Sequence, residues 1–165
     1  MPAIVQWKRL VALSFVLMLL SSAVLVLVST GAAHAAKSER ERKIAHALKI
    51  ARNQKGDPYQ YGADGPNRFD CSGLTQFAFG KAGLSLPRTS DDQSRYVRRL
   101  HDRGNIRAGD FMFFADGGDV YHMGIFTGRW EDHRRIILHA SRSGTPVKVD
   151  PMWTYDWYAG TLRRR

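Results

Sequence analysis

The hydrophobic pattern of this chain changes its period near residue 105. Upstream, apolar residues recur at three- and four-residue intervals, the spacing of one helix face. Downstream, short runs of β-branched and aromatic residues alternate with turn residues, which is the pattern of strands. The connections between these runs are short, and short connections favour antiparallel neighbours. Helices followed by strands predict an α+β domain with N-terminal helices packed on a small antiparallel sheet.

Helix signals appear at three places in the first part of the chain. Ser38 and Glu41 have the spacing of a capping box, which favours a helix start. A second helix is expected to begin near Cys71 and to stop at Gly83, and a third to begin at a Thr-Ser cap. The expected helices cover residues 39–54, 71–82 and 90–100.

Strand signals follow in the second part of the chain. Four short runs combine β-branched and aromatic residues: 111–114, 120–127, 136–140 and 147–149. The polar run 129–135 is expected to be a connection. The aromatic run 153–158 is expected to close the core. We find no internal repeat and no low-complexity linker, so the sequence predicts one domain.

The N-terminus has the order of a secretory signal. Lys8 and Arg9 precede an apolar run, residues 10–28, and small residues then lead to a cleavage position after Ala35. The apolar run is long for a signal core and close to the length of about 20 residues that spans a bilayer. An uncleaved anchor is therefore the alternative to a signal peptide at residues 1–35. Either interpretation predicts an exported working domain of residues 36–165.

The charge composition limits the kinds of partner that this domain is expected to bind. The formal net charge of the chain is +10, and loss of residues 1–35 with their two basic residues would leave +8. A basic surface suits anionic wall polymers or a membrane surface, although a solvated basic surface is the simpler interpretation. Basic residues at 95–107 and 129–135 alternate with acidic ones, which argues against a nucleic-acid groove. We expect a monomer that contacts a membrane only if its N-terminal segment is retained.

Cys71 is the single cysteine of the chain, so it cannot form an intramolecular disulfide. It is placed where a turn-rich loop is expected to become a helix. Unpaired backbone N–H groups and the helix dipole at such a position favour the thiolate, which is the nucleophilic form of cysteine. The alternative is that Cys71 is a small buried apolar residue.

A cysteine nucleophile needs a base, and the base needs an orienting group. His122 and His139 both lie inside apolar strand runs, whereas the other four histidines are in polar or terminal segments. Two alternatives stay open on these residues alone: satisfied structural histidines, and metal ligands. Structural zinc sites usually draw on closely spaced ligands, and Cys71, His122 and His139 contain no close pair. We therefore expect neither a metal nor a cofactor.

Six short motifs carry a family resemblance that covers residues 40–160. Together they resemble the NlpC family of papain-like bacterial cell-wall peptidases. In chain order the motifs are Gly56-x-Pro58-Tyr59-x-Tyr61-Gly62, Phe69-Asp70-Cys71-Ser72-Gly73-Leu74, Leu86-Pro87-Arg88-Thr89-Ser90, Gly109-Asp110-Phe111-Met112-Phe113-Phe114, His122-Met123-Gly124-Ile125-Phe126-Thr127-Gly128 and His139-Ala140. The resemblance implies a papain-like fold.

The resemblance also implies roles for individual residues. Cys71 matches the nucleophile, His122 the general base and His139 the residue that orients the base. Tyr59 matches a tyrosine whose hydroxyl lies near the oxyanion site. Tyr61, in the same loop, is interpreted as a packing residue.

Three further residues match positions that bind the substrate. Asp70 and Ser72 match residues that line the pocket for the peptidoglycan stem peptide, and Arg88 is a candidate to bind its carboxylates. The implied activity is hydrolysis of a stem-peptide amide bond, commonly the one between D-glutamate and a diamino acid. An amidase or transferase acting on another wall substrate and an inactive basic wall-binding domain are the alternatives. His133 is a competitor for the role of His139.

Overall fold

The computed structural model describes Ala35 and residues 39–163. The chain divides into two compact units, Met1–Glu39 and Arg40–Arg165. The predicted signal or anchor, with its apolar run at 10–28, lies outside the described residues except for Ala35. In the described part, no helix is both long and apolar enough to cross a bilayer.

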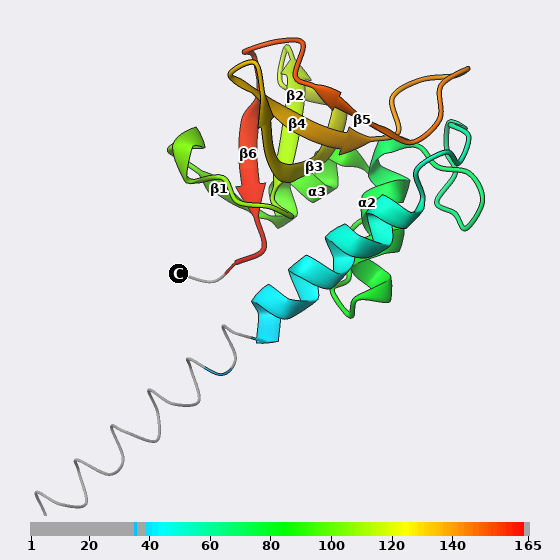
Figure 1. The fold of residues 1–165 in the computed structure, drawn as a ribbon, viewed down its shortest axis with the longest axis horizontal. Coiled ribbons are helices and arrows are strands. Elements are labelled where there is room, and N and C mark those ends of the chain that lie inside the picture. Colours follow the sequence, from blue (N-terminus) through cyan, green and yellow to red (C-terminus); the bar gives the residue numbers. More distant parts are fainter. Residues whose placement is uncertain (1–34, 36–38, 164–165) are drawn as a thin grey trace, which may run out of the picture. The chain divides into compact units, whose positions relative to one another are not determined.

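The helices of the second unit lie on one side of its sheet (Figure 1). The first helix extends to residue 53 and buries Ile44 and Leu48. Helix α2 spans Cys71–Lys81, and Gly83 follows it with a φ of 75° that favours glycine. Helix α3 spans Ser90–Tyr96 and has Thr89 as its N-cap, as the sequence predicts.

A six-stranded antiparallel sheet forms the rest of the described domain, with the order β1-β6-β2-β3-β4-β5. A short 3₁₀ helix, Arg103–Asn105, separates the first two strands along the chain. The strands are β1 Arg98–Leu100, β2 Phe111–Asp116, β3 Asp119–Glu131, β4 Arg134–His139, β5 Lys148–Pro151 and β6 Tyr158–Thr161.

Two predicted elements had wrong boundaries, and strand β6 was not predicted. The third helix ends at Tyr96, because the next residues form β1 and pair with β6. The predicted connection at 129–135 is mostly strand, since β3 and β4 continue to a tight turn at Asp132 and His133, whose φ values are positive. His133 is exposed at that turn and does not take the place of His139. The sequence also missed β6, which lies between β1 and β2.

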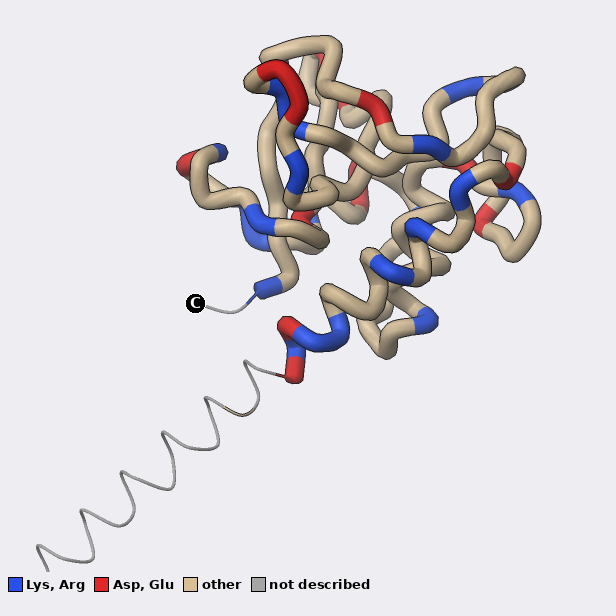
Figure 2. The backbone as a smooth tube through the Cα atoms, in the orientation of Figure 1, with Lys and Arg blue, Asp and Glu red and all other residues tan. Residues whose placement is uncertain are grey.

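Both faces of the sheet are covered by apolar side chains. On β2, Phe111 and Phe113 pack in one cluster with the helices, while Met112 and Phe114 pack in a second cluster that includes Trp157. Neighbouring residues of a strand point to opposite faces, so the continuous apolar run of β2 reflects burial on both sides. Lys and Arg are spread over several elements and interleaved with Asp and Glu (Figure 2).

Candidate active site

The start of α2 is held by the loop that precedes it. Asp70 is the N-cap: its Oδ1 accepts a hydrogen bond of 2.7 Å from the Gly73 N–H, and its Oδ2 accepts one of 3.0 Å from the Gly62 N–H. The loop also packs directly on the helix. A Cβ at Gly73 would collide with the backbone of Ala63, so only glycine fits there. These contacts fix the position of Cys71, the first residue of α2.

Asp70 also anchors the side chains of Arg88 and Ser72. The two terminal nitrogens of Arg88 donate to the two Asp70 oxygens at 3.0 and 2.5 Å, and one of them also reaches Ser72 Oγ at 3.0 Å. Burial alone would raise the pKa of Asp70, but hydrogen bonds from Arg88 and Gly73 lower it below its ordinary value. The three predicted binding residues thus form one ionised network, in which the terminal nitrogens of Arg88 are already engaged.

A cavity of about 550 Å³ opens over this network. Tyr59 and Cys71 line it, and burial raises the pKa of the Tyr59 phenol, with Cys71 and Asp70 adding to the effect. Tyr61 is 87% exposed at the rim, so its interpretation as a packing residue was wrong. The lining residues are Tyr59, Tyr61, Gly62, Asp70, Cys71, Ser72, Arg88, Thr89, Ser90, Asp91, Val120 and Tyr121.

The Cys71 thiol is less acidic than its place at a helix start led us to expect. Burial raises its pKa above the ordinary value, and the charge of Asp70 raises it further. Backbone hydrogen bonds from Met123, Ser72 and Cys71 itself act in the opposite direction without reversing the shift. The resting group at neutral pH is therefore the thiol. It becomes a nucleophile only when a base removes its proton.

A chain of hydrogen bonds joins three neighbouring strands, the first of which contacts Cys71. His122 lies on β3, immediately before Met123, whose backbone contacts the thiol. Its Nε2 is 2.9 Å from Nδ1 of His139, the last residue of β4. The Nε2 of His139 is in turn 3.0 Å from Oδ2 of Asp150 on β5. The sequence pointed to both histidines but not to Asp150.

Both histidines are held in the neutral form. Burial, with a contribution from His139, lowers the pKa of His122 to about 3. Burial also lowers the pKa of His139, although Asp150 opposes this shift. A neutral imidazole keeps a lone pair, so at neutral pH His122 is in the form that a general base requires, although burial disfavours its protonated form.

Trp153 covers this histidine pair from the solvent side. Its ring lies 5.5 Å from the ring of His139 and 5.7 Å from that of His122, and it stacks on Phe114 at 4.6 Å between centroids. Half of Trp153 stays exposed, so it closes the site more than the core. A second cavity of about 440 Å³ lies there and shares Tyr121 with the first. Its lining residues are Tyr121, His122, His139, Ser141, Arg142, Thr145, Lys148, Asp150 and Trp153.

Metal binding would compete for the same kinds of side chain. In the described part of the chain, no three or more His, Cys, Asp or Glu side chains form a group suited to a metal ion. His122, His139 and Asp150 are instead hydrogen-bonded to one another. Their arrangement suits proton transfer to and from a neighbouring thiol.

The sequence profile of the NlpC/P60 family matches residues 56–165. This chain belongs to the NlpC/P60 family. The probable endopeptidase p60 of Listeria monocytogenes is 38% identical over 110 residues, which are 66% of this chain and 21% of that protein. A probable endopeptidase of Corynebacterium glutamicum is 40% identical over 97 residues, 59% of this chain and 43% of the relative. The chain thus spans less than half the length of these relatives.

Solved structures confirm the fold class. The P60 domain of the antigen MAP1204 from M. avium subspecies paratuberculosis matches with a TM-score of 0.65 and 27% identity, over 76% of this chain and 98% of that domain. RipD of Mycobacterium tuberculosis, described as a non-catalytic NlpC/p60 domain protein, has a TM-score of 0.61 and 24% identity, over 73% of this chain and 97% of RipD. The predicted α+β, papain-like architecture is that of the family.

Proposed function

We propose that this protein is an exported cysteine endopeptidase that hydrolyses amide bonds in peptidoglycan stem peptides. The observation that carries the proposal is the contact of the Cys71 sulfur, at the start of α2, with the backbone of Met123 on β3. Met123 directly follows His122, which is hydrogen-bonded to His139. The relatives named as probable endopeptidases support the reaction class. A relative from Bacillus subtilis, a bifunctional muramidase/DL-endopeptidase, is 39% identical over 85 residues, which are 49% of this chain and 26% of that protein. The name DL-endopeptidase supports a bond between a D- and an L-centre, and we propose the stem-peptide bond between D-glutamate and a diamino acid.

The proposed reaction begins from a neutral thiol and a neutral imidazole. His122 accepts the Cys71 proton while the sulfur attacks the scissile carbonyl carbon, and the C–S bond forms. The protonated His122 then gives this proton to the leaving amine as the C–N bond breaks. Water hydrolyses the acyl-enzyme with His122 as the base, and the thiol is regenerated. The raised pKa of Cys71 and the lowered pKa of His122 oppose a resting ion pair, so proton transfer accompanies attack.

The oxyanion that forms during attack needs hydrogen-bond donors. Backbone N–H groups at the start of α2 already reach the Cys71 sulfur. We assign the oxyanion site to these groups together with the Tyr59 hydroxyl, because the Tyr59 phenol lies in the same cavity and close enough to Cys71 for the thiolate to raise its pKa.

The substrate-binding residues of the proposal lie on one wall of the first cavity. Asp70 and Ser72 line the cavity, and the Ser72 hydroxyl donates to Asp70, so we assign to them the shape and charge of the wall that a stem peptide would contact. Arg88 has both terminal nitrogens engaged by these two residues, which favours a role in holding the wall over direct binding of carboxylates. The working domain would meet its substrate outside the cell, where residues 1–35 direct it.

The proposal is tested by digestion of purified peptidoglycan with the full-length protein. We expect release of soluble muropeptides, and mass spectrometry should find new termini at a stem-peptide bond. Cys71→Ala should abolish release with an unchanged circular dichroism spectrum. His133→Ala is the matched control, since this histidine is exposed at a hairpin turn. Undiminished release by Cys71→Ala would refute the nucleophile, and wall binding without cleavage by the intact protein would favour a binding domain.

A further inference from the structure

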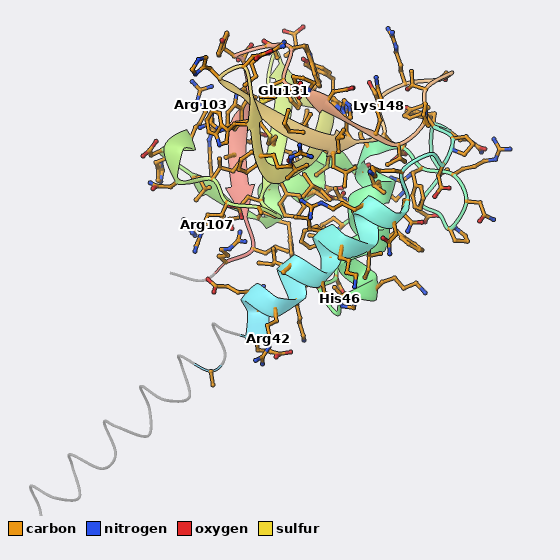
Figure 3. All side chains as sticks on the ribbon, viewed as in Figure 1. Arg42, His46, Arg103, Arg107, Glu131 and Lys148 are labelled. Carbon is orange, nitrogen blue, oxygen red and sulfur yellow. The ribbon has the colours of Figure 1, made fainter. Side chains whose placement is uncertain are left out.

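Asp150 ends the hydrogen-bonded chain and lies outside the three positions of the nucleophile, base and orienting residue. Its Oδ2 is 3.0 Å from Nε2 of His139 and 2.9 Å from Nζ of Lys148. Lys148 and Asp150 are two residues apart on β5, so both side chains are on the same face of the strand. Figure 3 labels Lys148 there.

The ionisation of Asp150 determines where the proton of His139 is. Burial alone would raise the pKa of Asp150, but hydrogen bonds from Lys148 and His139 lower it, so the group is a carboxylate at neutral pH. A carboxylate only accepts hydrogen bonds. The Nε2 of His139 must therefore carry a hydrogen and donate it to Asp150.

The tautomer of His139 in turn determines the tautomer of His122. A neutral imidazole carries one N–H, so Nδ1 of His139 has a lone pair and accepts. The contact of 2.9 Å then requires His122 to donate from its Nε2. His122 is neutral as well, which leaves its Nδ1 as the free lone pair. Nδ1 is the ring nitrogen nearer the main chain, and the next backbone group, that of Met123, contacts the Cys71 sulfur.

We propose that Asp150 is a positioning residue that sets the tautomers of His139 and His122, so that Nδ1 of His122 is the atom that takes the Cys71 proton. The inference rests on the proposed function for its kinetic consequence only. The opposite tautomer would place a hydrogen on Nδ1 of His122 and leave no acceptor for the thiol proton. Lys148 contributes by holding the carboxylate ionised. Trp153 contributes by packing against the rings of the two histidines.

The test compares Asp150→Leu with Asp150→Glu in the full-length protein. Long-range ¹H–¹⁵N NMR of the histidine rings should show the Nε2–H tautomer for His122 and His139 in the parent protein. In Asp150→Leu the Nδ1–H form should appear, kcat should fall about 10- to 100-fold, and KM should stay within about two-fold. Asp150→Glu should restore the Nε2–H pattern and most of kcat.

Glu131→Leu provides the matched control. It removes a carboxylate from the far end of β3, at the hairpin turn, and should change neither readout (Figure 3). A loss of kcat in Asp150→Leu with unchanged ring ¹⁵N shifts would mean a merely structural role and would overturn the inference. Unchanged kcat with unchanged shifts would overturn it as well. If the tautomers respond but the parent protein cleaves no peptidoglycan, the proposed function fails and the assignment of Asp150 stands.

Discussion

The two sides of the candidate site are built in different ways. On the cysteine side, Asp70, Ser72 and Arg88 are within 19 residues of one another and form a charged network. On the histidine side, residues of β3, β4 and β5 meet only through strand register, and the two imidazoles are neutral. Charged groups fix the geometry around Cys71, whereas burial keeps His122 and His139 neutral. Under the proposed function, Cys71 depends on His122 for its activation, because its own surroundings raise the pKa of the thiol.

After removal of the Cys71 sulfur itself, loss of the Tyr59 hydroxyl should have the largest effect on turnover among changes that keep the fold. Tyr59→Phe should lower kcat about 10²- to 10³-fold, the usual cost of losing one oxyanion donor. The thermal midpoint should change little, because no hydrogen bond of the hydroxyl within the described residues would be broken. Tyr61→Phe is the control, since Tyr61 is at the exposed rim of the same cavity. Equal kcat for the parent and Tyr59→Phe would exclude Tyr59 from the oxyanion site.

Removal of the Asp70 carboxylate should disrupt the contacts of Asp70 that hold the start of α2, and so destabilise the fold. Asp70→Ala loses the cap of α2, its bond to Gly62 and the partner of Arg88, so the free energy of unfolding should fall by about 2–3 kcal/mol in a urea titration. Asp92→Ala removes a carboxylate from the first turn of α3 that bonds Thr89 and Arg95 in an exposed position, so it should cost less than Asp70→Ala. Similar losses for the two variants would show that the network around Asp70 does not stabilise the fold.

The pH dependence of thiol alkylation should test whether the surroundings of Cys71 raise the pKa of its thiol. The pKa of Cys71 is raised above its ordinary value of 9.0, so the thiolate fraction, and with it the rate of reaction with iodoacetamide, should still be rising above pH 9. Titratable and charged groups face the thiol or the two histidines from several elements: Tyr59, Asp70, Arg88, His122, His139 and the pair Lys148–Asp150. A rate plateau from acid pH to neutrality would instead reveal a preformed thiolate–imidazolium pair.

Local signals explain what could be predicted from the sequence. The turn-rich loop, the apolar spacing after Cys71 and the Thr89 cap act within a few residues, so the helix starts were confirmed. The end of α3 was wrong because pairing of β1 with β6, about 60 residues away, outweighs local helix propensity. No sequence signal marks Tyr158–Thr161 as the strand between β1 and β2.

The residues of the candidate site also separate into those with a local sequence signal and one that depends on strand pairing. Cys71, His122 and His139 were proposed as site residues from their types, from their surroundings in the sequence and from the family resemblance. Asp150 was missed because a carboxylate beside a lysine in a short strand has the pattern of ordinary surface. Only the pairing of β4 with β5 brings its oxygen to the His139 ring. One signal could have suggested it: Asp150 is the single acidic residue between His139 and the aromatic run at 153–158.

Strand β5 lies at the edge of the sheet, so Asp150 can act on the histidine pair without being part of the hydrophobic core. Asp150 is 31% exposed and has a neighbouring strand on one side only, whereas the histidine pair is packed among buried residues. A substitution at the edge can therefore alter proton affinity without repacking the interior. Related chains could diversify their working pH at this strand while the cysteine helix and the central strands stay unchanged.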